Sequence, residues 1–259
     1  MASVSPKISI RGLRKSFGKK EVLRDFDLDL EAGASLVLIG ASGTGKSVLL
    51  KCILGIIQPD AGEILIDGVN ILKASSAERE RRTRQIGMLF QGSALFDSLK
   101  VWENVAFRII YSERKARALA RQRAIDCLAK VGLGEEIGNL SPSELSGGMQ
   151  KRVALARAIA AEPSILFFDE PTTGLDPITA DVINNLIIDR VREAGATAIS
   201  ITHDMASARK IGDDVAMLHE GRVIWRGRAD EIEDAGNPFV DQFINGRADG
   251  PIKMSLRAS

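Results

Sequence analysis

The sequence predicts an α/β fold built around a parallel sheet. Short, continuous apolar runs of strand length alternate with helical stretches, which is typical of βαβ units whose strands are covered on both faces. These runs lie at 35–39, 86–90, 165–168 and 196–201. Antiparallel strands precede the first run, and a helical insertion separates the second from the third. We therefore expect a parallel core, an N-terminal antiparallel β-subdomain and an inserted α-helical subdomain.

The N-terminal segment has the pattern of a strand with one solvent-exposed face. Phe26, Leu28 and Leu30 alternate with aspartates, which is the period of a half-buried antiparallel strand. Near the other end, residues 215–225 read as two short strands joined by a Glu-Gly turn. Beyond Asn237 the pattern fades, and we expect an irregular tail there.

The helical insertion, from about 98 to 134, has apolar residues at three- and four-residue spacing. We expect one apolar stripe made of Ala116, Leu119, Ala120, Ala124, Cys127, Leu128 and Val131. The basic residues of this stretch favour a solvated helix face over a ligand site. Both cysteines, Cys52 and Cys127, have apolar helical surroundings without metal-ligand spacing, so we expect them in the core.

Length and composition describe an ordinary globular protein. The chain has 259 residues, 45% of them apolar, and 35 Lys and Arg against 34 Asp and Glu give a net charge of +1. That length suits one large domain with an inserted subdomain. The longest apolar run is four residues, whereas a spanning helix needs roughly 20. With no apolar leader at the N-terminus, we expect the chain to stay in the cytoplasm. Its near-neutral charge and 5% aromatic content argue against nucleic acid as a partner.

A phosphate-binding loop follows the first buried strand. Its residues are Gly40, Ala41, Ser42, Gly43, Thr44, Gly45, Lys46, Ser47 and Val48, and an apolar helical pattern continues from there. Glycines let successive amides point inward, and the helix adds its positive N-terminal end. Lys46 can reach the β- and γ-phosphates, and the Ser47 hydroxyl can bind Mg²⁺. A merely flexible glycine turn would not require Lys-Ser in front of a helix.

Further polar residues end other buried strands. Asp169 follows 165–168 as a candidate Mg²⁺ ligand, and Glu170 is a candidate general base; alone, such a pair is as readily a helix cap. His203 follows 196–201, and Gln91 follows 86–90. Because strand ends meet at the ligand crevice of such a sheet, we expect all four near the γ-phosphate, with Gln91 binding Mg²⁺ or positioning water. A lone histidine is more often structural.

A second glycine motif precedes another helix. Ser146, Gly147 and Gly148 at a helix N-terminus form a second anion-binding device, followed by Met149. Because 100 residues and the helical insertion separate Ser146 from Lys46, we expect the two devices to serve one nucleotide only between two chains arranged head to tail.

In this order, the motifs resemble those of the ATP-binding cassette (ABC) ATPases over nearly the whole chain. Residues 40–47 resemble Walker A, Gln91 the Q-loop, 145–149 the signature, Asp169 and Glu170 Walker B, 175–176 the D-loop and His203 the switch histidine. Phe17 lies where the family places an aromatic on adenine. The resemblance implies a P-loop NTPase ABC ATPase fold with a RecA-like core, which binds ATP and Mg²⁺ and hydrolyses ATP as a homodimer.

The resemblance also implies roles for residues. The catalytic residues would be Glu170, His203, Gln91 and Lys46. Ser47, Gln91 and Asp169 would hold the metal. Across the dimer, Ser146, Gly147, Gly148, Met149 and Asp176 would contact the partner's ATP. The ATPase domain would span 1–245, with its helical subdomain at about 92–162, and the tail 246–259 would be a dimer contact.

One departure narrows the resemblance. The signature has Met149 where Gln is commoner, and together with 88–96, 142–149 and 243–251 this is similar to the ATPase subunits of Mla/Mce-type lipid transporters. That group implies phospholipid transport across the bacterial cell envelope, with the chain on the cytoplasmic side of the inner membrane. The permease and Mce-domain lipid-binding subunits would be other chains.

Alternatives of other classes remain. The chain could serve another ABC importer or a division-associated complex with the same catalytic residues. A DNA-acting ATPase fits less well because the motif interval is short and lacks a sustained heptad, and ribosome-acting members usually carry two cassettes. Near the Q-loop, Phe96, Asp97 and Ser98 are candidate permease contacts, although Leu95 and Phe96 would equally suit the core of the insertion.

Overall fold

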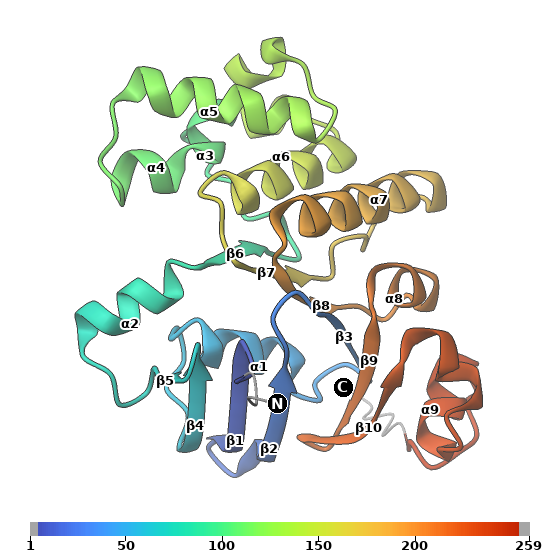
Figure 1. Ribbon diagram of the computed structural model, residues 1–259. Coiled ribbons are helices and arrows are strands. Elements are labelled where there is room, and N and C mark those ends of the chain that lie inside the picture. Colours follow the sequence, from blue (N-terminus) through green and yellow to red (C-terminus); the bar gives the residue numbers. More distant parts are fainter. Residues whose placement is uncertain (1–4, 254–259) are drawn as a thin grey trace.

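The computed structural model describes residues 5–253, which form two sheets and a group of helices (Figure 1). The first sheet has the order β2-β1-β4-β5 and is antiparallel. Its strands are β1 (Ile8–Phe17), β2 (Lys20–Leu30), β4 (Ala61–Ile66) and β5 (Val69–Asn70). As predicted, Phe26, Leu28 and Leu30 are buried on one face of β2. The antiparallel β-subdomain is therefore present, and it also takes in a later hairpin.

The second sheet has the order β10-β9-β3-β8-β7-β6, in which β10 alone runs antiparallel to its neighbour. Its strands are β3 (Ser35–Ile39), β6 (Ile86–Leu89), β7 (Ile165–Asp169), β8 (Thr197–Ile201), β9 (Asp214–His219) and β10 (Arg222–Arg228). All four predicted parallel strands and the predicted β9–β10 hairpin are confirmed. This α/β architecture agrees with the predicted fold class.

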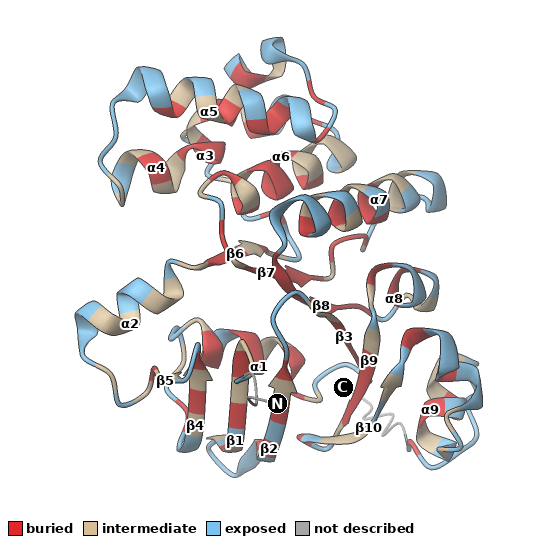
Figure 2. Cartoon of the chain, in the orientation of Figure 1, coloured by how far each residue is buried: buried red, intermediate tan, exposed pale blue. Residues whose placement is uncertain are grey.

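The strands of the second sheet are apolar on both faces because each face packs against a different core. Along β3, Val37 and Ile39 belong to a core shared with helices, whereas Leu36 and Leu38 belong to a core shared with the antiparallel sheet. Figure 2 shows β7 and β3 as almost continuously buried. A strand covered on both faces exposes its polar chemistry at its ends.

Helices cover the sheet and extend above it in Figure 1. They are α1 (Lys46–Ile53), α2 (Ser76–Thr83), α3 (Val101–Val105), α4 (Phe107–Tyr111), α5 (Arg117–Lys130), α6 (Gly147–Ile159), α7 (Pro177–Ala194), α8 (Met205–Ile211) and α9 (Pro238–Ile244), with short 3-10 turns η1 (Glu135–Asn139), η2 (Pro142–Glu144) and η3 (Ala229–Asp234). None of the helices in 5–253 is both long and apolar enough to span a bilayer.

Two sequence expectations are corrected. Leu119 is 58% exposed and Ala116 is exposed too, so the α5 stripe is narrower than predicted and starts at Ala120. The segment after Asn237 is not irregular, since Asn237 caps α9 and Pro238 occupies its first turn. Asn-Pro was the signal for this helix. Both cysteines are buried, as expected.

The chain beyond α9 folds back onto that helix as far as the structure describes it. Gln242 is 6% exposed; its Nε2 donates to the carbonyls of Arg247, Ala248 and Ile252, and its Oε1 accepts from the Ile252 amide at 2.7 Å. A buried amide with all these partners satisfied fixes the course of the segment. The remaining tail, 254–259, lies outside the described residues.

Gly87 sets the distance between β6 and α6. A Cβ added to Gly87 would lie 2.1 Å from the Ala158 carbonyl oxygen and 2.8 Å from Pro163 Cγ. Helix α6 therefore contacts this strand at a separation that a side chain would prevent.

We expect Gly87→Ala to lower the free energy of unfolding by about 1–3 kcal/mol, because the backbone of α6 must shift to admit the methyl group. Urea denaturation would measure this. Gly92→Ala is the matched control, since a Cβ at Gly92 meets nothing within 4 Å. Equal unfolding midpoints for both variants would contradict the packing argument.

Candidate nucleotide site

The loop between β3 and α1 has a shape that requires glycine. Gly40, Gly43 and Gly45 have φ angles of 142°, 78° and 109°. A Cβ would lie 2.2 Å from the Leu218 carbonyl oxygen at Gly40 and 2.8 Å from that of Val22 at Gly45. No side chain caps α1, so its first-turn amides face the loop without that partner. This is a cradle for an anion.

Lys46 is held inside this loop. Its Nζ donates to the carbonyls of Gly40 at 2.6 Å and Ala41 at 3.0 Å, and the residue is 9% exposed. Burial lowers the pKa of Lys46, while the negative charges of Glu170 and Asp169 oppose that shift. An incoming anionic group would therefore find a cation already oriented by the loop.

Asp169 and Ser47 lie face to face. Asp169, the last residue of β7, accepts a hydrogen bond from Ser47 Oγ to Oδ1 at 3.4 Å. Burial raises the pKa of Asp169, and the Ser47 hydrogen bond opposes that shift. A hydroxyl and a carboxylate, with the Gln91 amide on the same cavity, are the oxygen ligands that Mg²⁺ prefers. Within 5–253 no three His, Cys, Asp or Glu side chains cluster as a metal site.

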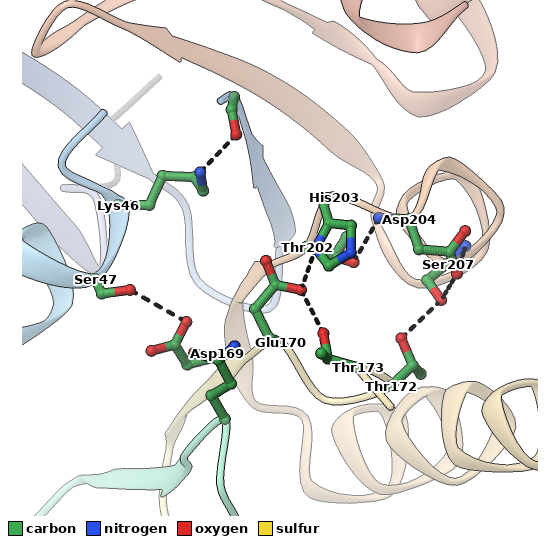
Figure 3. A network of polar contacts seen from close by, with 12 residues as sticks. Lys46, Ser47, Asp169, Glu170, Thr172, Thr173, Thr202, His203, Asp204 and Ser207 are labelled. Atoms are coloured by element: carbon green, nitrogen blue, oxygen red, sulfur yellow. Dashed lines mark hydrogen bonds and ion pairs between the residues drawn. The ribbon is translucent and has the colours of Figure 1, made fainter. Parts of the chain in front are cut away.

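The Glu170 carboxylate contacts two side chains, those of Thr173 and His203 (Figure 3). Its Oε2 lies 2.8 Å from Nδ1 of His203 and accepts from Thr173 Oγ1 at 2.9 Å. Its backbone has φ 51°, an unusual angle for a residue with a Cβ, and its amide donates to the Ile201 carbonyl on β8. The side chain of Glu170 is 14% exposed and that of His203 is 63% exposed. The carboxylate is therefore fixed at the inner end of the site.

A buried polar network supports the segments that carry Thr173 and His203. Ser207 on α8 donates to Asp204 Oδ2 at 2.6 Å and lies 3.3 Å from the Thr172 hydroxyl. Asn184 of α7 donates to the same Ser207 oxygen at 2.8 Å. Asp204 caps α8 directly after His203. Hydrogen bonds thus connect the segment that carries Thr173 with the one that carries His203.

These residues surround a cavity of about 700 Å³. It is lined by Phe17, Lys20, Val22, Gly40, Ser42, Gly43, Gly45, Lys46, Ser47, Val48, Gln91, Asp169, Glu170, Ile201 and His203. Ala41 and Thr44 belong to the loop without lining the cavity; the Thr44 hydroxyl donates to the Ala41 carbonyl. Phe17 is 49% exposed at the rim. The structure therefore brings together the loop, strand-end and aromatic residues that the sequence singled out.

The second glycine motif lies away from this cavity. Ser146 caps α6 by accepting from the Met149 amide at 3.3 Å, with Gly147 exposed beside it. A Cβ on Gly148 would lie 2.9 Å from Thr179 Cγ2. The Met149 side chain packs against the helical core. Ser146 therefore presents a helix start to solvent.

Asp176 also lies outside the cavity and caps α7. Its carboxylate accepts from the amides of Ile178 and Thr179 and from the Thr179 hydroxyl, which lowers the pKa of Asp176. Within one chain, the residues expected to act across a dimer thus do not reach the phosphate loop.

Sequence reasoning missed several residues of the site. Thr173 orients Glu170, Lys20 and Val22 line the cavity, and Lys151 donates to the Glu170 carbonyl at 3.3 Å. A hydroxyl three residues after Glu170 was a readable signal for Thr173. Lys151 had none, because its role depends on how α6 packs.

Comparisons with known proteins agree with this arrangement. The family model described as ABC transporter matches residues 23–173. A protein of Mycobacterium leprae (strain TN) named probable ribonucleotide transport ATP-binding protein is 40% identical, covering 96% of this chain and 71% of the relative. The intermembrane phospholipid transport system ATP-binding protein MlaF of Escherichia coli (strain K12) is 37% identical, covering 99% and 95%.

A solved structure gives the same result for the fold. The structure is that of the ATP-binding cassette MJ0796, a dimer in a post-hydrolysis state bound to ADP and Pi. One chain of it superposes on this chain with a TM-score of 0.78 at 33% identity, covering 86% of this chain and 98% of that one. The chain therefore belongs to the ABC transporter family, as one of its ATP-hydrolysing ATP-binding subunits.

Proposed function

We propose that this subunit drives lipid transport, most specifically of phospholipid, across a bacterial cell envelope. The observation that carries the proposal is the similarity to the phospholipid transport protein MlaF over 99% of this chain and 95% of the relative. The Met149 signature and the shared C-terminal pattern favour the same group. The permease and Mce-domain subunits would then be separate chains, which hold the ATPase on the cytoplasmic side of the inner membrane.

A second candidate is transport of ribonucleotides. It is favoured by the name of the Mycobacterium leprae relative, which is 40% identical. Because the catalytic residues are common to both functions, the ATPase itself does not discriminate between them. The transported molecule is selected by partner chains, so the discriminating experiment uses the whole complex.

In the proposed mechanism, the loop 40–45 and the start of α1 bind the phosphates of ATP through backbone amides. Lys46 leaves its carbonyl partners for the phosphate oxygens, where an ionised partner strengthens each hydrogen bond. Phe17 stacks on the adenine at the rim. Ser47, Asp169 and Gln91 would hold Mg²⁺, which neutralises phosphate charge when it is bound.

Glu170 is the proposed general base. Its carboxylate accepts a proton from water and directs that water at the γ-phosphate. His203 and Thr173 hold one oxygen, Oε2, which leaves Oε1 to face the water. The exposed His203 lines the same cavity and would contact the γ-phosphate side of the nucleotide.

We also propose the dimer and its domain roles. Ser146, Gly147, Gly148, Met149 and Asp176 would complete the ATP site of the partner, since none of them lines the cavity of its own chain. Residues 1–245 would form the ATPase domain, with the helical subdomain at about 92–162, and 246–259 would contact the partner. Phe96, which is 44% exposed and stacked on Phe107, would contact the permease together with Asp97 and Ser98.

Thr173→Val should reduce kcat for ATP hydrolysis by roughly tenfold with an unchanged KM, because the Glu170 carboxylate loses the hydrogen bond that orients it. Steady-state hydrolysis by the purified chain would measure this. Thr173→Ser, which keeps the hydroxyl, is the control and should remain close to wild type. An unchanged kcat in Thr173→Val, or a loss in Thr173→Ser as large as that in Thr173→Val, would contradict the role given to this hydrogen bond.

Mixed dimers test whether the site is composite, in a Glu170→Gln background that retains ATP. Lys46→Ala in one protomer and Ser146→Arg in the other damage the same composite site, so one ATP per dimer should remain. Both substitutions in a single protomer damage both composite sites, so none should remain. Sites built within one chain would give the reverse result. Nucleotide bound per tagged heterodimer is the measurement.

Purification of the intact complex from native membranes tests the transported substrate. We expect a permease and an Mce-domain protein to copurify, with phospholipid detected by mass spectrometry and moved between vesicles only with ATP. A Glu170→Gln complex is the control and should retain phospholipid without moving it. Copurification of a soluble binding protein together with ATP-driven uptake of ribonucleotides would support the second candidate instead.

A further inference from the structure

Two cations on α6, the buried Lys151 and the half-buried Arg157, bind the segment that begins at Gln91. Lys151 Nζ donates to the carbonyl of Gln91, and Arg157 donates to the carbonyls of Ser93 and Ala94, each at 2.6 Å. Three carbonyls within four residues are therefore bound by the same helix. That helix begins at the signature residue Ser146.

These cations lack the partners that usually accompany buried charge. Lys151 is 5% exposed, and neither Lys151 nor Arg157 forms an ion pair with any carboxylate in residues 5–253. Burial lowers the pKa of Lys151 and lowers that of Arg157 to about 10. Burying a cation against carbonyls alone is costly, and apolar side chains would pack α6 at less cost. The arrangement therefore calls for a role beyond stability.

The loop itself has a backbone that must be held in place. Ser93 and Ala94 have φ angles of 61° and 49°, a region that residues with a Cβ seldom adopt. This backbone turns both carbonyls toward Arg157. The strain is thus located at the point where the helix binds the loop.

Residues 96–100, which follow this segment, contact helices α3 and α4. Asn104 of α3 is fully buried; its Nδ2 donates to the carbonyls of Phe96, Leu99 and Lys100, and its Oδ1 accepts from the Phe96 amide at 2.7 Å. Phe96 stacks on Phe107 of α4. Toward the parallel sheet, Lys151 also donates to the Glu170 carbonyl at 3.3 Å, and α6 packs on β6 at Gly87.

From this we propose that Lys151 and Arg157 are positioning residues that lock the segment 91–94 to α6. Gln91 is then held at a fixed position relative to the helix that carries Ser146. The inference builds on the proposed role of Gln91 at Mg²⁺ or water.

A double-mutant cycle tests the route through which Lys151 acts. Lys151→Met should lower kcat for ATP hydrolysis by at least tenfold with KM for ATP within threefold of wild type, and it should cause no further loss in a Gln91→Ala background. Arg152→Met, a neighbouring cation on α6 outside this set of contacts, is the matched control and should keep wild-type kcat. Independent, additive losses would assign Lys151 to Glu170 and overturn the proposal.

A distance measurement tests the lock without relying on activity. Spin labels on Gly92→Cys and on Ala118→Cys of α5, both exposed positions, should give a narrow distance distribution in the full-length chain. The native cysteines are buried and can be replaced by alanine. Arg157→Gln should broaden the distribution, and Arg157→Lys should restore it in part. An unchanged width in Arg157→Gln would overturn the proposal, even if Gln91→Ala showed that Gln91 itself is dispensable for hydrolysis.

If Lys151→Met fails to fold, Lys151→Gln keeps a donor of similar length for the same cycle. Thermal unfolding monitored by circular dichroism separates the two effects. A kcat loss with an unchanged melting temperature supports positioning, whereas a kcat loss that tracks the melting temperature across the variants would mean that the cations only stabilise the fold.

Discussion

Apolar cores cover both faces of the central sheet, and this burial determines where the polar site can lie. Alternate side chains of β3 and β7 enter two separate cores, so neither strand has room for a polar side chain along its length. Polar residues are tolerated where the strands end. The phosphate loop, Asp169, Glu170 and His203 all follow strand ends, and they meet because parallel strands end at a common edge.

Burial and neighbouring charges act in opposite directions on Lys46. Burial lowers the pKa of Lys46, whereas the carboxylates of Glu170 and Asp169 raise it, and burial also raises the pKa of Asp169. Glu170 accepts a hydrogen bond from Thr173, which follows β7, and lies 2.8 Å from Nδ1 of His203, which follows β8. The carboxylate therefore reports on the relative placement of these segments, and a small shift of either one changes its orientation.

Much of the fold was readable because it rests on local patterns. The apolar runs predicted β3, β6, β7 and β8, and the glycine loop with Lys46 and Ser47 predicted the cradle. What escaped prediction depends on packing between distant parts. Leu119 fits the helical spacing but faces solvent, since the neighbouring helices do not cover it. Lys151 looks like an ordinary helix cation in sequence, and its contacts with Gln91 and Glu170 exist only once α6 lies against β6.

The clash predicted at Gly40 has a consequence for how the protein is made. The carbonyl that leaves no room for a Cβ there belongs to Leu218 on β9, and β3 pairs with β8 and β9 on its two sides. Both partner strands come from the last quarter of the chain. A growing chain therefore carries the phosphate-loop sequence long before it has the neighbours that shape it, so ATP cannot assist the early steps of folding. Nucleotide binding is acquired only after β9 has been made.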